Sequence, residues 1–290
     1  MGLEMNSECY LCQMERNLSA VRKLGSDAKA TEFAKAMMEM YLRSPADVSS
    51  PYYGPVIAEL LHERYGVDID RYRQEKAEAN NFVLARLDAI RSRVEGAEDP
   101  LLAGIQYAIL GNFLDYATLR EEVTMERLEE MLADAEKMEL DMEVLARLRR
   151  ELAESKKLLV LTDNAGEIGF DRVLAEQIQR IYPHLEITFC VRGGPAANDA
   201  TREDAALVGV PFPVVDTGSK IAGVLPGYIS EEAKNAMEEA DVILSKGQAN
   251  VECLYGSGYN IYYAFLIKCS RFINLFGKAK MTPMLIRERK

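Results

Sequence analysis

The second half of the chain alternates short apolar runs with amphipathic stretches. The first run, 158–161, has the length of a strand that is buried on both faces, and a polar turn at 162–167 follows it. A helical pattern comes after the turn. Further apolar runs lie at 187–191, 213–215, 242–244 and 261–267. This alternation predicts βαβ units, and therefore an α/β fold with a mostly parallel sheet.

The first half of the chain shows helical periodicity instead. No confident strand pattern occurs before Lys157. Apolar residues three and four positions apart, with Pro and Gly as stop signals, predict a series of helices. We place them at 28–43, 51–65, 70–94, 100–116, from 124 onward, and at 143–152. The sequence thus predicts a helical domain over 1–154 and an α/β domain over 155–290.

Composition and charge narrow the class of protein. A formal net charge of -11 over 290 residues argues against a general nucleic-acid binder, which needs a basic surface. No apolar run approaches the ~18 residues of a membrane span. The N-terminal segment lacks the basic-then-apolar layout of a signal peptide. Because five cysteines are an odd and modest number, we expect a cytoplasmic protein without a disulfide framework.

Three of the predicted strands end in polar clusters. These are TDNAGE at 162–167, RGGPAANDAT at 192–201 and SKGQANVE at 245–252. The carboxyl ends of parallel strands face one crevice, so the clusters can converge. One polar strand end is ordinary loop composition, but three of this kind predict a shared functional site.

The acids and amides of these clusters indicate a metal site. Asp163, Asn164 and Asp199 supply hard oxygen donors, which suit Mg²⁺, Mn²⁺ or a similar divalent ion. Because the chain has only two histidines, we do not expect a His-rich zinc site. An alternative role for Asp163 is the N-cap of the following helix.

Lys246 and Gly247 suggest that the ligand contains phosphate. A lysine before a glycine offers a cation beside an exposed backbone N–H group, although a solvated loop lysine has the same pattern. Asn198 and Thr201 can donate further hydrogen bonds. A metal ion together with a phosphate-binding lysine indicates phosphoryl chemistry, in which the metal polarises a phosphoryl oxygen.

Weaker patterns add three candidates. Glu167 either positions water or substrate, or complements the dipole of the helix that it begins. Asn112 and Asp115 lie about one turn apart on one face of the apolar 100–116 helix. We expect both to reach the crevice from the helical half, and the alternative is a buried hydrogen-bonded pair.

Cys9 and Cys12 have the spacing of half a zinc site or of a redox pair. A closed zinc site needs two more ligands, so simple packing is a third interpretation.

Motifs of several other site types are missing. The turn at 162–167 is neither a dinucleotide-binding nor a nucleoside-triphosphate loop. Ala165 stands where phosphatases of the dehalogenase type have a second Asp.

The strand-end motifs together resemble those of a known family. DNAGE at 163–167, NDAT at 198–201 and KGQAN at 246–250 are similar to motifs of the metal-dependent damage-control phosphatases. The CxxC at 9–12 resembles the start of the small prokaryotic branch of that family. The resemblance implies an all-α N-terminal domain on a Rossmann-like α/β/α sandwich.

The resemblance also implies a site and an activity. Asp163, Asn164 and Asp199 would hold a divalent ion (Mn, Mg, Co or Ni), while Lys246 and the region of Asn250 would contact phosphate. The substrate would be a small phosphorylated metabolite, such as a sugar phosphate or a phosphopantetheine derivative, often a damaged one. Either a metal-bound water or Asp163 itself would attack phosphorus.

Two other functions stay open, as does the oligomeric state. One is carboxyl methyl transfer from S-adenosylmethionine, which has been proposed for a eukaryotic branch of the family. It predicts a glycine-rich loop after the first strand, which 162–167 lacks. The other is a protein that binds a metal or ligand at this site without turnover.

Overall fold

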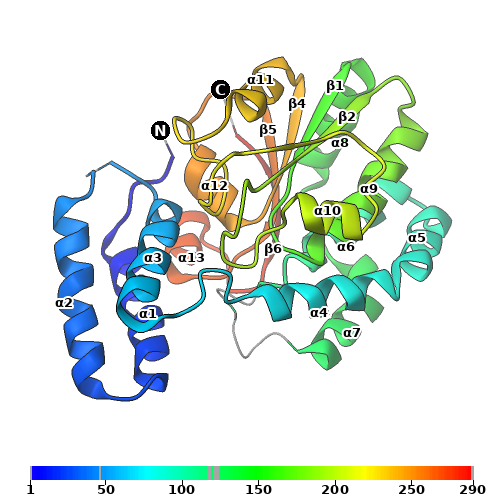
Figure 1. The fold of residues 1–290 in the computed structure, drawn as a ribbon. Coiled ribbons are helices and arrows are strands. Elements are labelled where there is room, and N and C mark those ends of the chain that lie inside the picture. The colour runs from blue at the N-terminus through cyan, green and yellow to red at the C-terminus, as the bar shows by residue number, and fades with distance from the viewer. Residues whose placement is uncertain (1, 46, 116–118, 120–123, 289–290) are drawn as a thin grey trace.

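A twisted β-sheet forms the centre of the molecule (Figure 1). The computed structural model describes residues 2–45, 47–115, 119 and 124–288. Within these ranges the sheet has six strands in the order β3-β2-β1-β4-β5-β6. They are β1 (Lys157–Leu161), β2 (Glu186–Val191), β3 (Val214–Asp216), β4 (Val242–Lys246), β5 (Ile261–Leu266) and β6 (Pro283–Arg287). The first five are parallel and β6 is antiparallel to β5, which confirms the predicted α/β fold.

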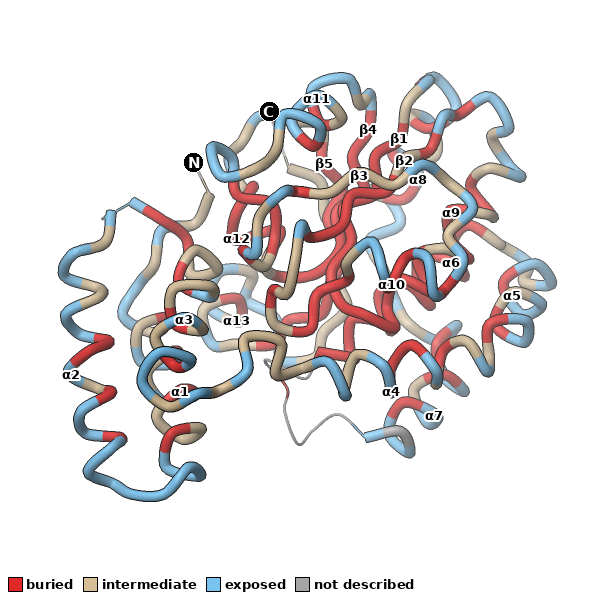
Figure 2. Tube along the Cα trace, in the orientation of Figure 1, coloured by how far each residue is buried: buried red, intermediate tan, exposed pale blue. Residues whose placement is uncertain are grey.

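Both faces of the sheet are buried, as the continuous apolar runs predict (Figure 2). Leu158 and Val160 of β1 belong to one hydrophobic cluster, and Leu159 and Leu161 to another, because successive strand residues point to opposite faces. Helices α9 (Glu167–Ile181) and α10 (Arg202–Leu207) cover the first face, and α11 (Glu231–Glu239), α12 (Gln248–Leu254) and α13 (Ser270–Phe276) cover the second. This is the Rossmann-like α/β/α sandwich that the family resemblance implies.

The helices from residue 73 to residue 154 share the core of the sheet. They are α4 (Arg73–Leu84), α5 (Leu87–Gly96), α6 (Pro100–Gly111), α7 (Met125–Ala133), the short η3 (Ala135–Lys137) and α8 (Met142–Glu154). Val83 of α4, Ile105 of α6 and Leu148 of α8 lie in the same hydrophobic cluster as Leu158 of β1. The core therefore continues across the predicted domain boundary at residue 154.

The first helices form a separate layer on the α12 and α13 side of the molecule (Figure 1). They are α1 (Ser7–Lys23), α2 (Asp27–Arg43), the short η1 (Ser50–Tyr52) and α3 (Tyr53–Tyr65), and they pack around their own cluster, which includes Phe33, Met37 and Tyr53. The Leu3 N–H group donates to the carbonyl oxygen of Glu252 at 2.7 Å and ties the start of the chain to α12. This layer reaches one wall of the cavity described below.

The predicted helix over 70–94 was wrong, because α4 and α5 are separate helices. The chain turns at Arg86, whose Nη1 donates to the carbonyl oxygen of Phe82 at 3.0 Å. The side chain thereby satisfies a carbonyl group at the end of α4 while its own backbone begins α5. The predicted helix over 100–116 ends at Gly111, and residue 116 lies outside the described residues. No helix in the described ranges has the length and hydrophobicity to span a membrane.

Candidate active site

The polar segments that follow β1, β2 and β4 meet at one edge of the sheet. Asn164 and Asp199 pair as an isolated antiparallel bridge. The Ala200 N–H group donates to the carbonyl oxygen of Asp163 at 2.7 Å. Gly247 packs directly against the Asp163 carboxylate. The structure thus brings together the three strand-end clusters.

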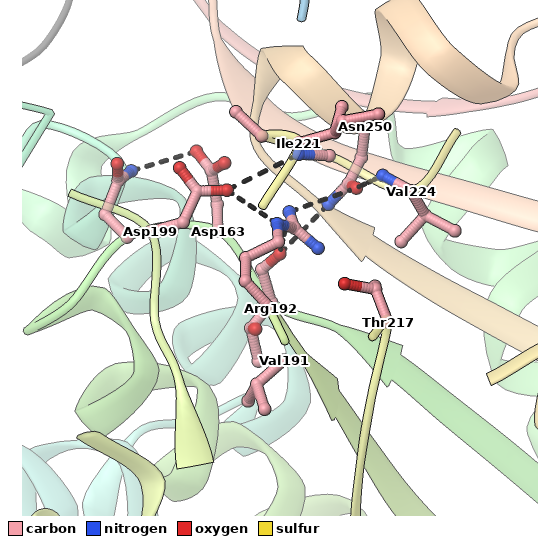
Figure 3. Close-up of polar contacts among 12 residues, drawn as sticks. Asp163, Val191, Arg192, Asp199, Thr217, Ile221, Val224 and Asn250 are labelled. Carbon is pink, nitrogen blue, oxygen red and sulfur yellow. Dashed lines mark hydrogen bonds and ion pairs between the residues drawn. The ribbon is translucent and has the colours of Figure 1, made fainter. Parts of the chain in front are cut away.

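Asp163 is a buried acid at the centre of this edge. Its Oδ2 accepts hydrogen bonds from the amides of Asn112 at 2.8 Å and Asn164 at 2.9 Å. Burial, followed by the charges of Asp199 and Glu167, raises the pKa of Asp163 well above its usual range. Figure 3 shows Asp163 and Asp199 side by side. Two neighbouring buried acids favour either a shared proton or a bound cation.

A buried arginine that the sequence analysis did not single out holds Asp199 (Figure 3). Arg192 donates from Nε to Asp199 Oδ2 at 2.6 Å, and from Nη2 to the carbonyl oxygen of Thr162 at 2.9 Å. Burial raises the pKa of Asp199, although Arg192 opposes the shift. The sequence feature that could have identified Arg192 is its position as a charged residue directly after an apolar strand.

Lys246 lies beneath the site and does not line the cavity. Its Nζ is 2.7 Å from both Glu167 Oε1 and Asp171 Oδ1, and it donates to the carbonyl oxygen of Ala108 at 2.8 Å. All three ammonium hydrogens thus have partners within the protein. The expected contact of Lys246 with phosphate does not fit this arrangement. Glu167 is also fully buried, and its Oε2 accepts the Asn164 amide at 2.7 Å.

Three other residues that were expected near phosphate use their donors within the fold. The Gly247 N–H group donates to a carbonyl oxygen of β5 at 3.2 Å. The Asn250 amide donates to two backbone carbonyl groups, at 3.0 and 2.6 Å. Thr201 caps α10, and its N–H and hydroxyl groups each lie 2.8 Å from Asp204 Oδ2. These contacts give all three residues structural roles around the site.

The end of α6 reaches the site. Besides its bond to Asp163, the Asn112 side chain accepts the Leu266 N–H group at 3.1 Å. Asp115 Oδ2 lies 2.8 Å from Nζ of Lys268, a buried lysine that the sequence analysis missed. The Lys268 N–H group donates to Gln248 Oε1 at 3.0 Å. The sequence feature that could have identified Lys268 is its position directly after the apolar run of β5.

A cavity of about 170 Å³ opens onto this edge of the sheet. Its buried part is lined by Asp115, Asp163, Asn164, Asn198 and Asp199. The rest of the wall comes from α1, η1, α3 and α12, and from residues in the 66–72, 195–197 and 220–222 segments. The predicted residues that line the cavity are therefore the acids and amides, while Lys246, Glu167 and Asn250 lie behind them.

Cys9 and Cys12 lie on α1 and do not line the cavity. Cys9 is buried and its Sγ accepts a hydrogen bond from Arg271 Nη1 at 3.2 Å, whereas Cys12 is exposed. All five cysteines are free thiols. The described residues contain no group of three or more His, Cys, Asp or Glu that could hold a metal ion. The metal and redox interpretations of Cys9 and Cys12 stay predictions from their spacing.

The fold and site define a Rossmann-like α/β protein with a buried, oxygen-rich site at the carboxyl ends of its parallel strands. The model of the damage-control phosphatase ARMT1-like domain matches residues 5–282. The chain belongs to this family. The match confirms the family that the strand-end motifs indicated, and the assignment to its CxxC-containing branch stays a prediction.

Relatives and a solved structure agree with this placement. A damage-control phosphatase of Archaeoglobus fulgidus is 34% identical over 242 residues, which cover 82% of this chain and 81% of that one. A damage-control phosphatase of Pyrococcus horikoshii is 34% identical over 169 residues, 57% of each chain. The crystal structure of a DUF89 family protein from Pyrococcus horikoshii matches 99% of this chain and 100% of that one, with a TM-score of 0.82 and 25% identity.

Proposed function

We propose that this protein is a divalent-metal-dependent phosphatase that hydrolyses a small phosphorylated metabolite. The observation that carries the proposal is the pair of buried carboxylates, Asp163 and Asp199, in the wall of a cavity. Neighbouring ionised carboxylates repel each other, and a divalent cation between them relieves the repulsion. Membership of the damage-control phosphatase family supports the same reaction. We also propose a cytoplasmic location, which the odd and modest number of cysteines favours.

Asp163, Asn164 and Asp199 suit a hard divalent ion. They offer two carboxylates and one amide, an all-oxygen donor set of the kind that Mg²⁺ and Mn²⁺ prefer, with Co²⁺ and Ni²⁺ as further candidates. Each is at most 4% exposed, and all three line the cavity. When bound, the ion would offset phosphoryl charge and polarise a phosphoryl oxygen.

The residues around this donor set keep it in a fixed geometry. Asn112 holds the Asp163 carboxylate, and Arg192 holds that of Asp199. Asn198 donates to Asn164 Oδ1 at 2.8 Å, which orients the amide. A site that is arranged before substrate binds needs no reorganisation during the reaction. Asp163 and an activated water molecule are the two candidate nucleophiles.

We assign the phosphate contact to Lys268 in place of Lys246. Lys268 does not itself line the cavity, but it pairs with a single acid, Asp115, which does line it, and its charge acts on Asp163, where it opposes the rise in pKa. An ammonium group in a buried setting binds phosphate strongly. Lys246 instead has the role of offsetting the charges of Glu167 and Asp171 behind the site.

Phosphate release tests the proposal. The substrates are p-nitrophenyl phosphate and a panel of sugar phosphates and phosphopantetheine, each with EDTA, Mg²⁺, Mn²⁺, Co²⁺ or Ni²⁺. We expect metal-dependent release that Asp163→Asn and Asp199→Asn each lower by at least ~100-fold. Glu98→Gln, which removes an exposed acid, should act like wild type.

Thermal unfolding supplies a second readout. Metal should raise the Tm of wild type and Glu98→Gln but not that of Asp199→Asn, because binding to the native state stabilises it. A metal-dependent rise in Tm without phosphate release from any substrate would reject the phosphatase. It would favour a binding protein or methyl transfer, and S-adenosylmethionine would be tested next.

A further inference from the structure

The cavity has two chemically different ends. Asp115, Asp163 and Asp199 lie in its buried part, whereas its outer wall carries Arg71 and Lys220. These two cations come from separate segments, one between α3 and α4 and the other after β3. Both line the same cavity of a protein whose net charge is -11. Positively charged side chains in the wall of a cavity attract anions towards them.

Arg71 and Lys220 each contribute a positive charge to the wall of the cavity. Within the described part of the chain, neither forms an ion pair. The Arg71 guanidinium lies over the Tyr72 ring, 5.2 Å from its centroid. The stem of Lys220 lies along Gly194, with Cγ 3.3 Å from the position of a Cβ on that glycine. Neighbouring residues thus support the Arg71 guanidinium and the Lys220 stem, and Arg71 is partly exposed and Lys220 exposed.

A third basic residue in the wall has a different setting. Arg16 of α1 acts on Glu252, a buried acid in the same wall, where its charge lowers the pKa against the larger effect of burial. Arg16 is thus close enough to a buried carboxylate of the protein for the two charges to interact. Glu59 is an exposed acid that also lines the cavity. These neighbours leave Arg71 and Lys220 as the pair suited to an incoming anion.

We propose that the substrate carries a second anionic group, phosphoryl or carboxylate, and that Arg71 and Lys220 bind it. The proposal rests on the phosphatase function and narrows its substrate class. The phosphate to be hydrolysed lies at the Asp163 end, and the second anion lies beside Arg71 and Lys220. Guanidinium and ammonium groups both recognise phosphoryl and carboxylate oxygens.

Matched substrate pairs test the proposal. Fructose 6-phosphate is compared with fructose 1,6-bisphosphate, and glycerol 3-phosphate with 3-phosphoglycerate. We expect wild type to show about fivefold to tenfold higher kcat/KM for the more anionic member of at least one pair. The substrate pair that shows the preference indicates whether the second anionic group is a phosphoryl group or a carboxylate. The preference should shrink as salt rises from ~0.05 to ~0.5 M, because salt screens exposed charges.

The variants assign the preference to the two cations. Arg71→Ala with Lys220→Ala should bring the ratio close to one, with a smaller loss of kcat/KM for p-nitrophenyl phosphate than for the more anionic substrates. Arg71→Lys with Lys220→Arg should keep most of the preference, and Glu59→Gln should increase it. Lys278→Ala, which removes an exposed lysine of the 277–280 segment, serves as the charge control.

Each outcome decides between the alternatives. Equal kcat/KM for both members of each pair in wild type, or a preference that survives the double alanine variant, overturns the proposal. If no monoester is hydrolysed with any metal, the phosphatase function fails instead. Calorimetry then measures the binding of fructose 1,6-bisphosphate and fructose 6-phosphate to wild type and the same variants. Equal affinities for the two ligands would reject the role of Arg71 and Lys220 in binding a second anion.

Discussion

Gly247 and Asp163 lie so close that no larger residue fits at position 247. A Cβ on Gly247 would be 1.9 Å from Asp163 Oδ2, and the glycine has φ +75°, a conformation that other residues rarely adopt. The carboxylate therefore lies between this glycine and the amides of Asn112 and Asn164. Position 247 is therefore a glycine because the Asp163 carboxylate occupies the space of a side chain there, and a phosphate contact is not needed to explain it.

Gly247→Ala should accordingly displace the Asp163 carboxylate. We expect a loss of at least ~100-fold in kcat, and about 2–4 kcal/mol less free energy of unfolding, because a steric clash adds to backbone strain. Phosphate release and urea denaturation measure the two effects. Gly96→Ala is the control, since nothing lies within 4 Å of a Cβ on that residue of α5. A fully active Gly247→Ala variant would contradict the close packing.

Arg192→Met tests the buried pair with Asp199, in which the two side chains are 0% and 6% exposed. The substitution leaves Asp199 without its cation, so we expect about 3–5 kcal/mol less free energy of unfolding. Adding Asp199→Asn removes the isolated charge and should restore part of the stability, but not the metal-induced rise in Tm. Urea denaturation of both single variants and the double variant measures the coupling. If the losses of unfolding free energy in the two single variants simply add in the double variant, the interaction between Arg192 and Asp199 contributes nothing to stability.

Lys268→Met and Lys246→Met separate phosphate binding from structural support. Lys246→Met leaves Glu167 and Asp171 buried without their cation, so its main effect should be lower stability, by about 3–5 kcal/mol. Lys268→Met removes the cation of Asp115, whose side chain is 12% exposed, so it should lose less stability than Lys246→Met, together with about 10²–10³ in kcat/KM. Steady-state kinetics and urea denaturation of both variants distinguish these roles. A stable Lys246→Met variant with weakened substrate binding would return the phosphate contact to Lys246.

The acids and amides of the site were predictable because of where they stand in the sequence. Asp163 and Asn164 directly follow an apolar run, and Asp199 lies in the cluster after the next run. The geometry of parallel sheets places such positions at one edge, whatever the details of packing. The roles of Lys246, Arg192 and Lys268 depend on which side chains their long stems reach. Lys246 reaches its partners only when α6 and α9 pack on the sheet, and Lys268 pairs with an acid that follows α6. Arg192 contacts residues that follow β1 and β2.

Two elements escaped the sequence pattern for physical reasons. The face of α1 that is buried consists of Cys9, Gln13, Asn17 and Val21, so two of its four positions are polar and the helical periodicity is weak. Strand β6 begins with a proline and is mostly half-buried. An edge strand of this kind carries neither a continuous apolar run nor clear alternation.

Glu252 of α12 should make stability depend on pH. Burial raises its pKa from the ordinary 4.5 to about 7, with Arg271 opposing the shift. Between these values the native state binds the proton more tightly than the unfolded state. The stabilising contribution is therefore complete below about pH 4.5 and is lost as the pH rises through about 7.

Glu252→Gln removes this titration while keeping a neutral side chain of similar shape. Relative to the variant, wild type should lose about 1 kcal/mol of unfolding free energy per pH unit as the pH rises from ~5 to ~7. Urea denaturation at half-unit pH steps measures the difference. Glu98→Gln, which replaces an exposed acid, is measured in the same way as the control substitution. A difference between wild type and Glu252→Gln that stays constant with pH would mean that Glu252 is ionised throughout, and that Arg271 and Arg16 offset its burial fully.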